Sequence, residues 1–307
     1  MEPQANHSWG VLGESVRGTS HVRSGSPNQD SMGTAFGNAP ADYLILAIAD
    51  GHGSPKSFRS DVGSRLAVEM ATDYASRFTA GTQGESLIFI KNAAEKLLPK
   101  DMVLAWRNAV SEHFSRHPFT SGELESSQQA AGSPGADDPR QFYLAYGTTL
   151  LLVVVSELFI IYLQLGDGDI LTVSGAMGAV ESPLIRDETL LANETTSLCM
   201  ENAHRMFRFR FQHLQEASPA LIMMSTDGYS NSFSSDADFH KVGPDLLRIL
   251  RTDGPQEVSG LLAGWLSEAS AKGSGDDVTL GVIYNLGTAA ANADASPDAA
   301  RPAPPVP

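Results

Sequence analysis

The chain has 307 residues, of which 42% are hydrophobic and 19% charged, a composition typical of a globular protein with a large core. Its 36 Asp and Glu against 21 Lys and Arg give a formal net charge of −15, which disfavours nucleic acid and anionic membranes as partners because like charges repel. One cysteine, Cys199, excludes an internal disulfide framework and cysteine-rich zinc sites, so we expect a reducing, cytoplasmic location.

The first predicted element is a strand over residues 43–49, a short apolar run. A helix is predicted over 58–78, because apolar residues recur there every four positions. A second helical block covers 86–114, where Pro99 is expected to kink or divide the helix. Residues 120–140 contain almost no large apolar residue and are interpreted as a flexible insertion.

A series of strands is predicted after this insertion, over residues 142–146, 149–155, 158–165 and 170–173. Only two residues separate the second strand from the third, which is too short for a crossover, so these two are expected to pair as a hairpin. Both are rich in β-branched residues and are interrupted by polar ones, which argues against a membrane span.

The C-terminal part predicts strands over 206–211, 221–224 and 278–285, and helices over 244–251 and 256–270. Long helices never alternate singly with strands, so antiparallel sheets with helices packed outside fit better than a doubly wound parallel sheet. We therefore expect one large α+β domain over residues 8–286. Residues 287–307 are rich in Ala, Pro and Asp and are expected to form a disordered tail.

Acidic residues stand at one end of four apolar strands. They are Asp50, Asp167, Asp227 and the pair Asp276 and Asp277. If these strand ends converge, the carboxylates cannot all stay ionised without cations. Hard divalent ions such as Mg²⁺ and Mn²⁺ prefer such oxygen ligands. A plain turn is the alternative for each Asp-Gly pair taken alone, but four acidic ends together favour a metal site.

The same acids belong to six short motifs. In chain order these are Asn28-Gln29-Asp30, Asp50-Gly51-His52-Gly53, Gly147-Thr148-Thr149, Gly166-Asp167-Gly168, Ser225-Thr226-Asp227-Gly228 and Gly275-Asp276-Asp277. Each motif alone is weak, but the ordered set resembles the protein phosphatase 2C family of metal-dependent Ser/Thr phosphatases, in a divergent, mainly prokaryotic form. The resemblance implies an α+β fold with a central antiparallel β-sandwich flanked by helices on both outer faces, in four αββα layers.

The resemblance also implies a centre with two Mn²⁺ or Mg²⁺ ions and a third, weaker one. Asp50 would bridge two ions, and the Gly51 carbonyl would bind one of them. Asp227 and Asp276 would complete the other, and Asp167 would help to hold the third ion near Asp227. A bridging hydroxide would attack the phosphorus of phosphoserine or phosphothreonine directly, without a covalent enzyme intermediate.

Two more residues receive catalytic roles from this resemblance. His52 follows the bridging Asp50 by two positions and is suited to protonate the leaving serine or threonine oxygen, with the orientation of water as its alternative role. Asp30 is expected to hold a metal-bound water, with a helix cap or turn as its alternative. Residues 181–204 match a mobile flap beside the active site of the family, although an ordinary surface loop fits them equally well.

Two positions depart from the family pattern. Members often have an arginine that grips the substrate phosphate five residues before the position of Asp30, and here that residue is Gly25. His21 and Arg23 are nearby phosphate-binding candidates, although an exposed Arg23 would ordinarily face solvent. The acidic residue often found directly before Asp30 is here the neutral Gln29, which should weaken the second metal.

The main functional hypothesis is therefore a phosphoprotein phosphatase, with a cognate Ser/Thr kinase in the same pathway. The departures at Gly25 and Gln29 motivate the alternative, a catalytically weak phosphatase-like module that binds metal or phosphopeptide in signalling. A phosphotransferase acting on nucleotides is disfavoured, because the sequence lacks the Gly-x4-Gly-Lys-Ser/Thr phosphate loop. Neither nucleic acid nor a membrane is expected as a partner.

Overall fold

The computed structural model of the chain describes residues 9–37, 42–130, 139–175, 178–185, 195–214 and 218–286. The strands are β1 (Trp9–Val16), β2 (Asp30–Gly37), β3 (Tyr43–Asp50), β4 (Leu150–Ser156), β5 (Phe159–Leu165), β6 (Asp169–Ser174), β7 (Val180–Glu181), β8 (Arg208–His213), β9 (Pro219–Ser225) and β10 (Val278–Asn285). The helices are α1 (Thr19–Ser24), α2 (Ser60–Gly81), α3 (Leu87–Arg116), α4 (Ser121–Ala130), α5 (Pro139–Leu144), α6 (Asp227–Ser230), α7 (Asp236–Phe239), α8 (Val242–Thr252) and α9 (Pro255–Lys272), with a 3₁₀ turn, η1, at Ala203–Arg205.

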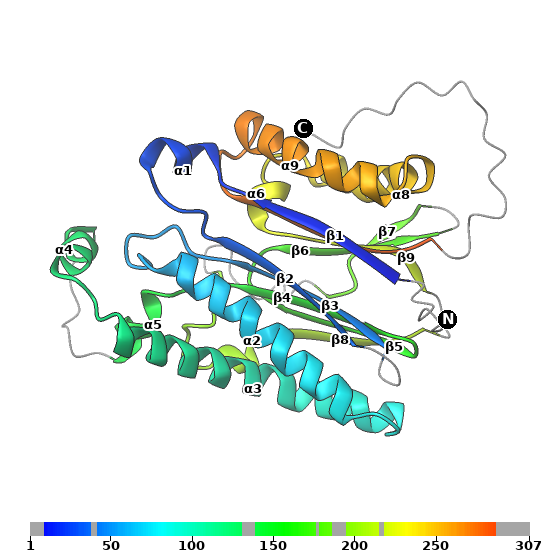
Figure 1. Cartoon of the computed structure of the whole chain (residues 1–307), viewed down its shortest axis with the longest axis horizontal. Helices are drawn as coiled ribbons and strands as arrows, with labels where there is room; N and C mark the ends of the chain where they lie inside the picture. The colour runs from blue at the N-terminus through cyan, green and yellow to red at the C-terminus, as the bar shows by residue number, and fades with distance from the viewer. Residues whose placement is uncertain are drawn as a thin grey trace, which may run out of the picture.

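The strands form two antiparallel sheets of five strands, in the orders β1-β10-β9-β6-β7 and β2-β3-β4-β5-β8. The sheets stack face to face (Figure 1). Helices α2 and α3 cover the outer face of the second sheet, and α8 and α9 cover the outer face of the first (Figure 1). The prediction of an antiparallel β-sandwich between two helical layers is confirmed.

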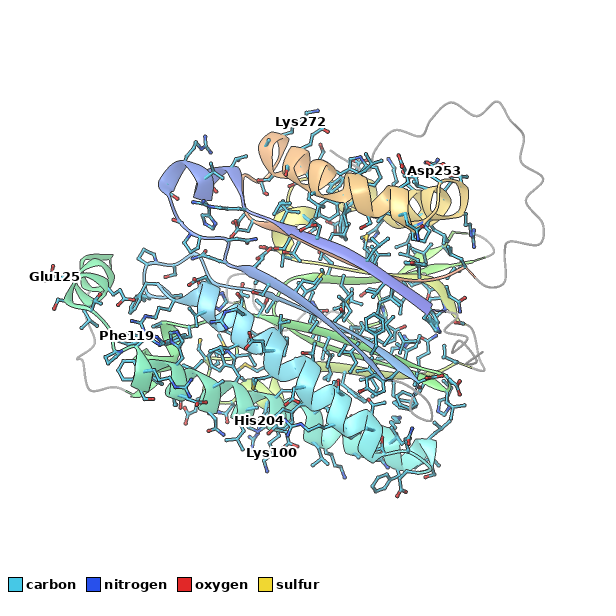
Figure 2. All side chains as sticks on the ribbon, in the orientation of Figure 1. Lys100, Phe119, Glu125, His204, Asp253 and Lys272 are labelled. Carbon is cyan, nitrogen blue, oxygen red and sulfur yellow. The ribbon has the colours of Figure 1, made fainter. Side chains whose placement is uncertain are left out.

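The central strand β3 shows why these strands are continuous apolar runs. Ile45 and Ala47 pack in the layer of α2 and α3, whereas Leu44 and Leu46 pack between the two sheets. Because neighbouring side chains on a strand point to opposite faces, a strand covered on both sides needs an apolar residue at every position. Each fully buried Leu or Ile contributes about 1.5–3 kcal/mol. Figure 2 shows side chains filling the space between the sheets, with Lys100 on the outer side of the helical layer.

Antiparallel pairing brings the starts of some strands and the ends of others to one end of the sandwich. Asp30 begins β2 and lies opposite Asp50, the last residue of β3. Ser225 ends β9 and pairs with Leu280 near the start of β10. The turn from β5 to β6 carries the chain between the sheets at this same end, because Asp169 also pairs with Ser225. The acidic strand ends therefore converge.

The observed elements differ from the predicted ones at several places. Residues 142–146 were predicted as a strand but form the end of α5 and a turn, because the rings of Phe142 and Tyr146 pack in an aromatic cluster with Phe114 and Phe119. Helix α3 runs through Pro99 undivided, since its buried side chains on both sides of the proline hold it against the core. Strands β1 and β2 were not predicted.

The domain boundaries stay predictions. Helix α4 occupies the first half of the predicted insertion, and residues 131–138 lie outside the described residues. Residues 186–194 of the predicted flap and the predicted tail, residues 287–307, also lie outside them. Among the described helices, none has both the length and the apolar character needed to cross a membrane.

Candidate active site

A small polar cavity of about 150 Å³ opens where the acidic strand ends converge. Its lining consists of Gln29, Asp50, Gly51, His52, Gly53, Thr149, Asp167, Thr195, Asp227, Asp276 and Asp277. Five of these residues are aspartates, and the described residues of the lining include neither lysine nor arginine. The structure therefore brings together all the predicted metal ligands and His52, one of the two predicted catalytic residues.

The backbone of Asp50 is held by the Gly147-Thr148-Thr149 motif. The Asp50 N–H donates to the Thr149 hydroxyl over 2.9 Å. In return, the Thr149 N–H and the Thr148 hydroxyl both donate to the Asp50 carbonyl over 2.8 Å. Three hydrogen bonds thus fix the last residue of β3, which gives its carboxylate a defined position at the cavity.

Two glycines near the cavity are required by close approach. A Cβ at Gly51 would lie 2.6 Å from the Ser60 carbonyl oxygen and 2.7 Å from that of Gln29. A Cβ at Gly147 would lie 2.7 Å from Cδ2 of His52, and the Gly147 carbonyl accepts the His52 N–H over 3.0 Å. Gly147 therefore makes room for the imidazole and also anchors its backbone.

The clustered carboxyl groups strongly perturb one another. Burial raises the pKa of Asp50 well above its usual range, and the charges of Asp30 and Asp227 raise it further. The pKa of Asp227 is also raised, first by burial and then by the charge of Asp167. Asp50 and Asp227 interact directly, so a cation bound between them would relieve the repulsion that raises the pKa of Asp50.

Hydrogen bonds to single oxygens orient the other carboxylates of the cavity. The Thr195 hydroxyl donates to Oδ2 of Asp167 over 2.5 Å. The side-chain amide of Asn231 donates to Oδ2 of Asp227 over 3.1 Å. Burial lowers the pKa of His52 below its ordinary value, although the nearby charge of Asp167 opposes this shift.

Asp30 lies beneath the cavity rather than in its lining. The residue is 7% exposed, and its Oδ2 accepts the hydroxyls of Thr226 over 2.8 Å and of Thr279 over 2.7 Å. Burial raises the pKa of Asp30 to about 8, although the two threonine hydrogen bonds lower it. As the first residue of β2, Asp30 supports Asp50 from the paired strand.

The two phosphate-binding candidates have different surroundings. His21 places Nδ1 2.8 Å from Oδ2 of Asp277, a residue of the cavity lining. Arg23 donates from Nε to the Thr19 carbonyl over 3.2 Å and lines a separate pocket between α1 and α9. Gly25 ends α1 with a φ of 81°, a conformation that favours glycine.

Asp277 belongs to the acids at strand ends, but the family resemblance gave it no role of its own. It is 3% exposed, its Oδ1 accepts the Gly18 N–H over 2.6 Å, and its Oδ2 accepts the Gln29 N–H over 2.6 Å. The carboxylate therefore connects both flanks of α1 to the start of β10. Two consecutive acids before an apolar strand were the only local indication of a role for Asp277. Its hydrogen-bond partners Gly18, His21 and Gln29 lie 248 to 259 residues away along the chain.

The donor set fits hard divalent cations. Aspartate oxygens and a backbone carbonyl are ligands that Mg²⁺ and Mn²⁺ prefer. The pKa of Asp50, which neighbouring carboxylates raise, indicates a position where positive charge would relieve repulsion. The side chain of Gln29 lines the cavity as a neutral group, and its backbone carbonyl accepts the Gly51 N–H over 3.1 Å.

An acid-lined cavity at the end of a helix-flanked β-sandwich defines a metal-dependent hydrolase of phosphate esters. The family model described as Protein phosphatase 2C matches residues 17–267, and the chain belongs to this family. No curated protein sequence matches the chain. As a member of the family, the chain is a metal-dependent Ser/Thr phosphatase that uses Mn²⁺ or Mg²⁺.

Solved structures of bacterial phosphatases share the fold. A bacterial serine phosphatase is 15% identical with a TM-score of 0.55, covering 90% of this chain and 97% of its own. The Ser/Thr phosphatase Stp1 from Staphylococcus aureus is 14% identical with a TM-score of 0.54, covering 89% and 94%. The catalytic domain of PstP, in complex with two manganese ions, is 16% identical with a TM-score of 0.50, covering 90% and 97%. At these identities the likeness shows the fold.

Proposed function

We propose that the chain hydrolyses phosphoserine and phosphothreonine in proteins at the acid-lined cavity. The observation that carries this proposal is the convergence of Asp50, Asp167, Asp227 and Asp276 from separate strand ends on one cavity. A phosphoryl group is itself negative, so it approaches such a cavity only when cations reverse the local charge. The acids therefore bind the ions, and the ions bind the phosphoryl group of the substrate.

Each acid has a distinct place in this proposal. Asp50 and the Gly51 carbonyl would hold one ion, Asp50 with Asp227 and Asp276 would hold another, and Asp167 would contribute to a third. When bound, the ions supply a nucleophile of lowered pKa for direct attack and neutralise the phosphoryl oxygens. The hydrogen bond from the Asp50 N–H to the Thr149 hydroxyl holds the backbone of Asp50, and the bond from the Asn231 amide orients the Asp227 carboxylate before any ion arrives.

The remaining residues act on protons and on the substrate. His52, with its ring packed against Gly147, would protonate the leaving serine or threonine oxygen. Asp30, behind Asp50, would orient water in the cavity. Of the two phosphate-binding candidates, His21 lies beside the cavity and Arg23 lines another pocket, so His21 has the stronger support.

The biological setting is also part of the proposal. A protein phosphatase of this kind acts on the products of a Ser/Thr kinase, so we expect a cognate kinase in the same pathway. We expect both proteins in the cytoplasm, where a chain with the single cysteine Cys199 is compatible with reducing conditions. Recovery of the kinase with the phosphatase from a cytoplasmic fraction tests this expectation.

The first experiment measures phosphate release from a phosphothreonine peptide with and without Mn²⁺. Asp227→Asn should lower kcat/KM by about 100-fold or more, because it removes a charge that holds an ion at the reaction centre. Asp253→Asn is the matched control, since Asp253 is exposed at the end of α8 (Figure 2) and should leave the rate unchanged.

Two outcomes would contradict the proposal. Full activity of Asp227→Asn would place the reaction elsewhere in the molecule. Tight binding of the phosphopeptide by folded wild-type protein, with no release at saturating Mn²⁺, would instead support the phosphatase-like binding module that Gly25 and Gln29 suggest.

A further inference from the structure

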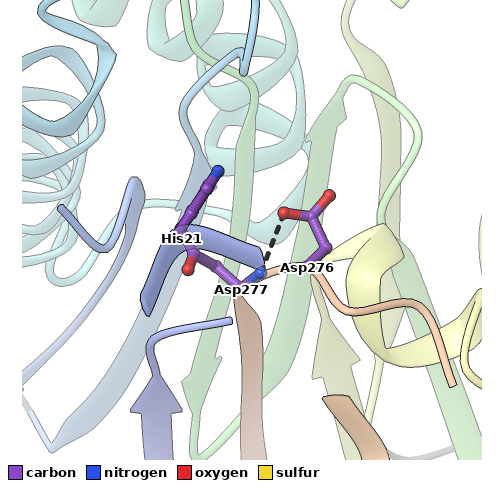
Figure 3. Close-up of side chains that lie close together, drawn as sticks. All are labelled: His21, Asp276 and Asp277. Carbon is purple, nitrogen blue, oxygen red and sulfur yellow. Dashed lines mark hydrogen bonds and ion pairs between the residues drawn. The ribbon is translucent and has the colours of Figure 1, made fainter. Parts of the chain in front are cut away.

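His21, Asp276 and Asp277 form a cluster on the α1 side of the cavity (Figure 3). One ring nitrogen of His21 and one carboxylate oxygen from each aspartate lie within 4.8 Å of one another. Two ligands of one ion with bonds of about 2.0–2.2 Å cannot be separated by much more than 4 Å. The cluster is therefore close to the size of a metal site, and it contains a nitrogen ligand that the acids of the cavity do not offer.

Asp277 is the buried member of this cluster. Its buried carboxylate already accepts two backbone N–H groups, those of Gly18 and Gln29, each over 2.6 Å. The same Oδ2 lies 2.8 Å from Nδ1 of His21. A carboxylate saturated in this way serves better to orient a ligand than to bind an ion itself.

The contact with Asp277 determines which nitrogen of His21 is available. Because a carboxylate accepts hydrogen bonds, Nδ1 donates to Asp277, which leaves Nε2 as the ring nitrogen that can meet a cation. The side chain of His21 is 17% exposed, so the imidazole is held by the fold without being closed off from solvent. A histidine whose second nitrogen donates to a carboxylate is the usual form of a metal-ligating histidine.

Asp276 supplies the oxygen ligand. Its Oδ1 accepts the N–H of Asp277 over 2.8 Å, which orients the carboxylate (Figure 3). The residue is exposed at the cavity, unlike its buried neighbour. Asp276 thus faces both the acids of the cavity and the imidazole of His21.

We propose that Nε2 of His21 and the carboxylate of Asp276 bind the same divalent cation, with Asp277 as the positioning residue of the imidazole. This inference rests on the proposed function, because Asp276 is a ligand in both. The bond from the His21 nitrogen to the cation would compensate for Gln29, which is neutral and offers the cation no charge. Imidazole favours Mn²⁺ over Mg²⁺, so the site selects the transition metal. His21 then acts on the substrate phosphate through the ion rather than by direct contact.

The test uses pulsed electron paramagnetic resonance of Mn²⁺ bound to the full chain, without substrate. Wild-type protein should show coupling of the Mn²⁺ spin to a histidine nitrogen, and His21→Gln should lose it. His52→Gln should keep the coupling, which distinguishes the two histidines of the site. His204→Gln is the remote control, since His204 lies in η1 beside α3 rather than beside α1 (Figure 2).

A second measurement is the affinity for each metal alone by calorimetry. The ratio of Mn²⁺ to Mg²⁺ affinity should fall in His21→Gln. Asp277→Asn should weaken Mn²⁺ binding by about 10–100-fold through the loss of orientation, and this variant keeps the inference testable if His21→Gln does not fold. Circular dichroism checks that each variant is folded.

Several results would overturn the inference. They are the absence of nitrogen coupling in wild-type protein, coupling that persists in His21→Gln, coupling that disappears in His52→Gln, and unchanged Mn²⁺ affinity in Asp277→Asn. None of these readouts needs turnover. An active phosphatase without nitrogen coupling would therefore reject the ligand role of His21 and leave the proposed function intact. Nitrogen coupling from His21 in an inactive protein would support the ligand role and contradict the proposed function.

Discussion

At the scale of single residues, the site depends on glycine as well as on residues with functional side chains. Gly147 has no Cβ, and His52 occupies the space that a Cβ would need. The backbone of a neighbouring segment therefore helps to place the imidazole. The same motif provides the threonine hydroxyls that hold Asp50.

Gly147→Ala should lower kcat by about 10–100-fold, because a Cβ 2.7 Å from Cδ2 of His52 displaces the ring from its working position. The measurement is steady-state turnover of a phosphothreonine peptide. Gly264→Ala is the control: it lies in α9 with open space around its Cβ position, so it should keep full activity and gain about 0.5–1 kcal/mol of stability. Equal activity of both variants would show that the position of His52 does not matter.

At the scale of elements, α4 is held to the body of the molecule by one buried arginine. Arg59 donates from Nε to Oε1 of Glu123 over 2.7 Å and from Nη2 to Oε2 over 3.0 Å. The guanidinium also bonds the Pro118 carbonyl and the Tyr146 hydroxyl, so it is fixed before α4 docks. The side chain of Glu123 is 27% exposed, which shields this pair partly from solvent.

The Arg59 hydrogen bonds lower the pKa of Glu123 to about 2 from its usual 4.5. A carboxyl whose pKa falls on folding stabilises the fold above its unfolded pKa, and this stability is lost as pH falls toward 2. Glu123→Gln should therefore cost about 1–2 kcal/mol at pH 7 and progressively less below pH 4.5. Hydrogen exchange of α4 amides measures this cost. Glu125→Gln is the control on the same helix and should have no effect at either pH; equal effects of both variants would contradict the prediction.

At the scale of the whole molecule, the acidic end of the sandwich works against folding when no cation is bound. The chain carries a net charge of −15, and its raised carboxyl pKa values show that the cavity holds negative charge at a cost. The acids proposed to bind metal therefore lower the stability of the folded chain when no cation is present. Cations that bind the folded state should restore that stability.

Mn²⁺ at about 100 times its dissociation constant should stabilise the chain by about 2.7 kcal/mol, which raises Tm by several degrees, and EDTA should reverse the shift. Asp50→Asn should show a smaller Mn²⁺ shift, because it removes the charge that we propose bridges two ions. In EDTA the same variant should be more stable than wild type, because it relieves repulsion. Thermal denaturation in both solutions measures these effects, and a Mn²⁺ shift that is unchanged in Asp50→Asn would place the ions elsewhere.

The fold was predictable where strands are covered on both faces. The β4–β5 hairpin and β10 were expected because their apolar runs are unbroken, and the structure confirms them. The sequence pattern does not indicate strands β1 and β2. Both lie at sheet edges, where small and polar residues such as Gly13 and Gly33 interrupt the apolar pattern. An edge strand forms because a neighbouring strand pairs with it, so its own composition only weakly indicates that it is a strand.

The family was predictable from the sequence itself, because the order of the short acidic motifs along the chain is characteristic of it. The same motifs contain the acids that we propose as metal ligands. The supporting hydrogen bonds were decided only by the tertiary structure. Thr279 reaches Asp30 across 249 positions, and Asp277 reaches Gly18 across 259. No local pattern encodes such pairs, since they exist only when two sheets bring their strand ends to the same side. The place of His21 beside Asp277 and Asp276 follows for the same reason.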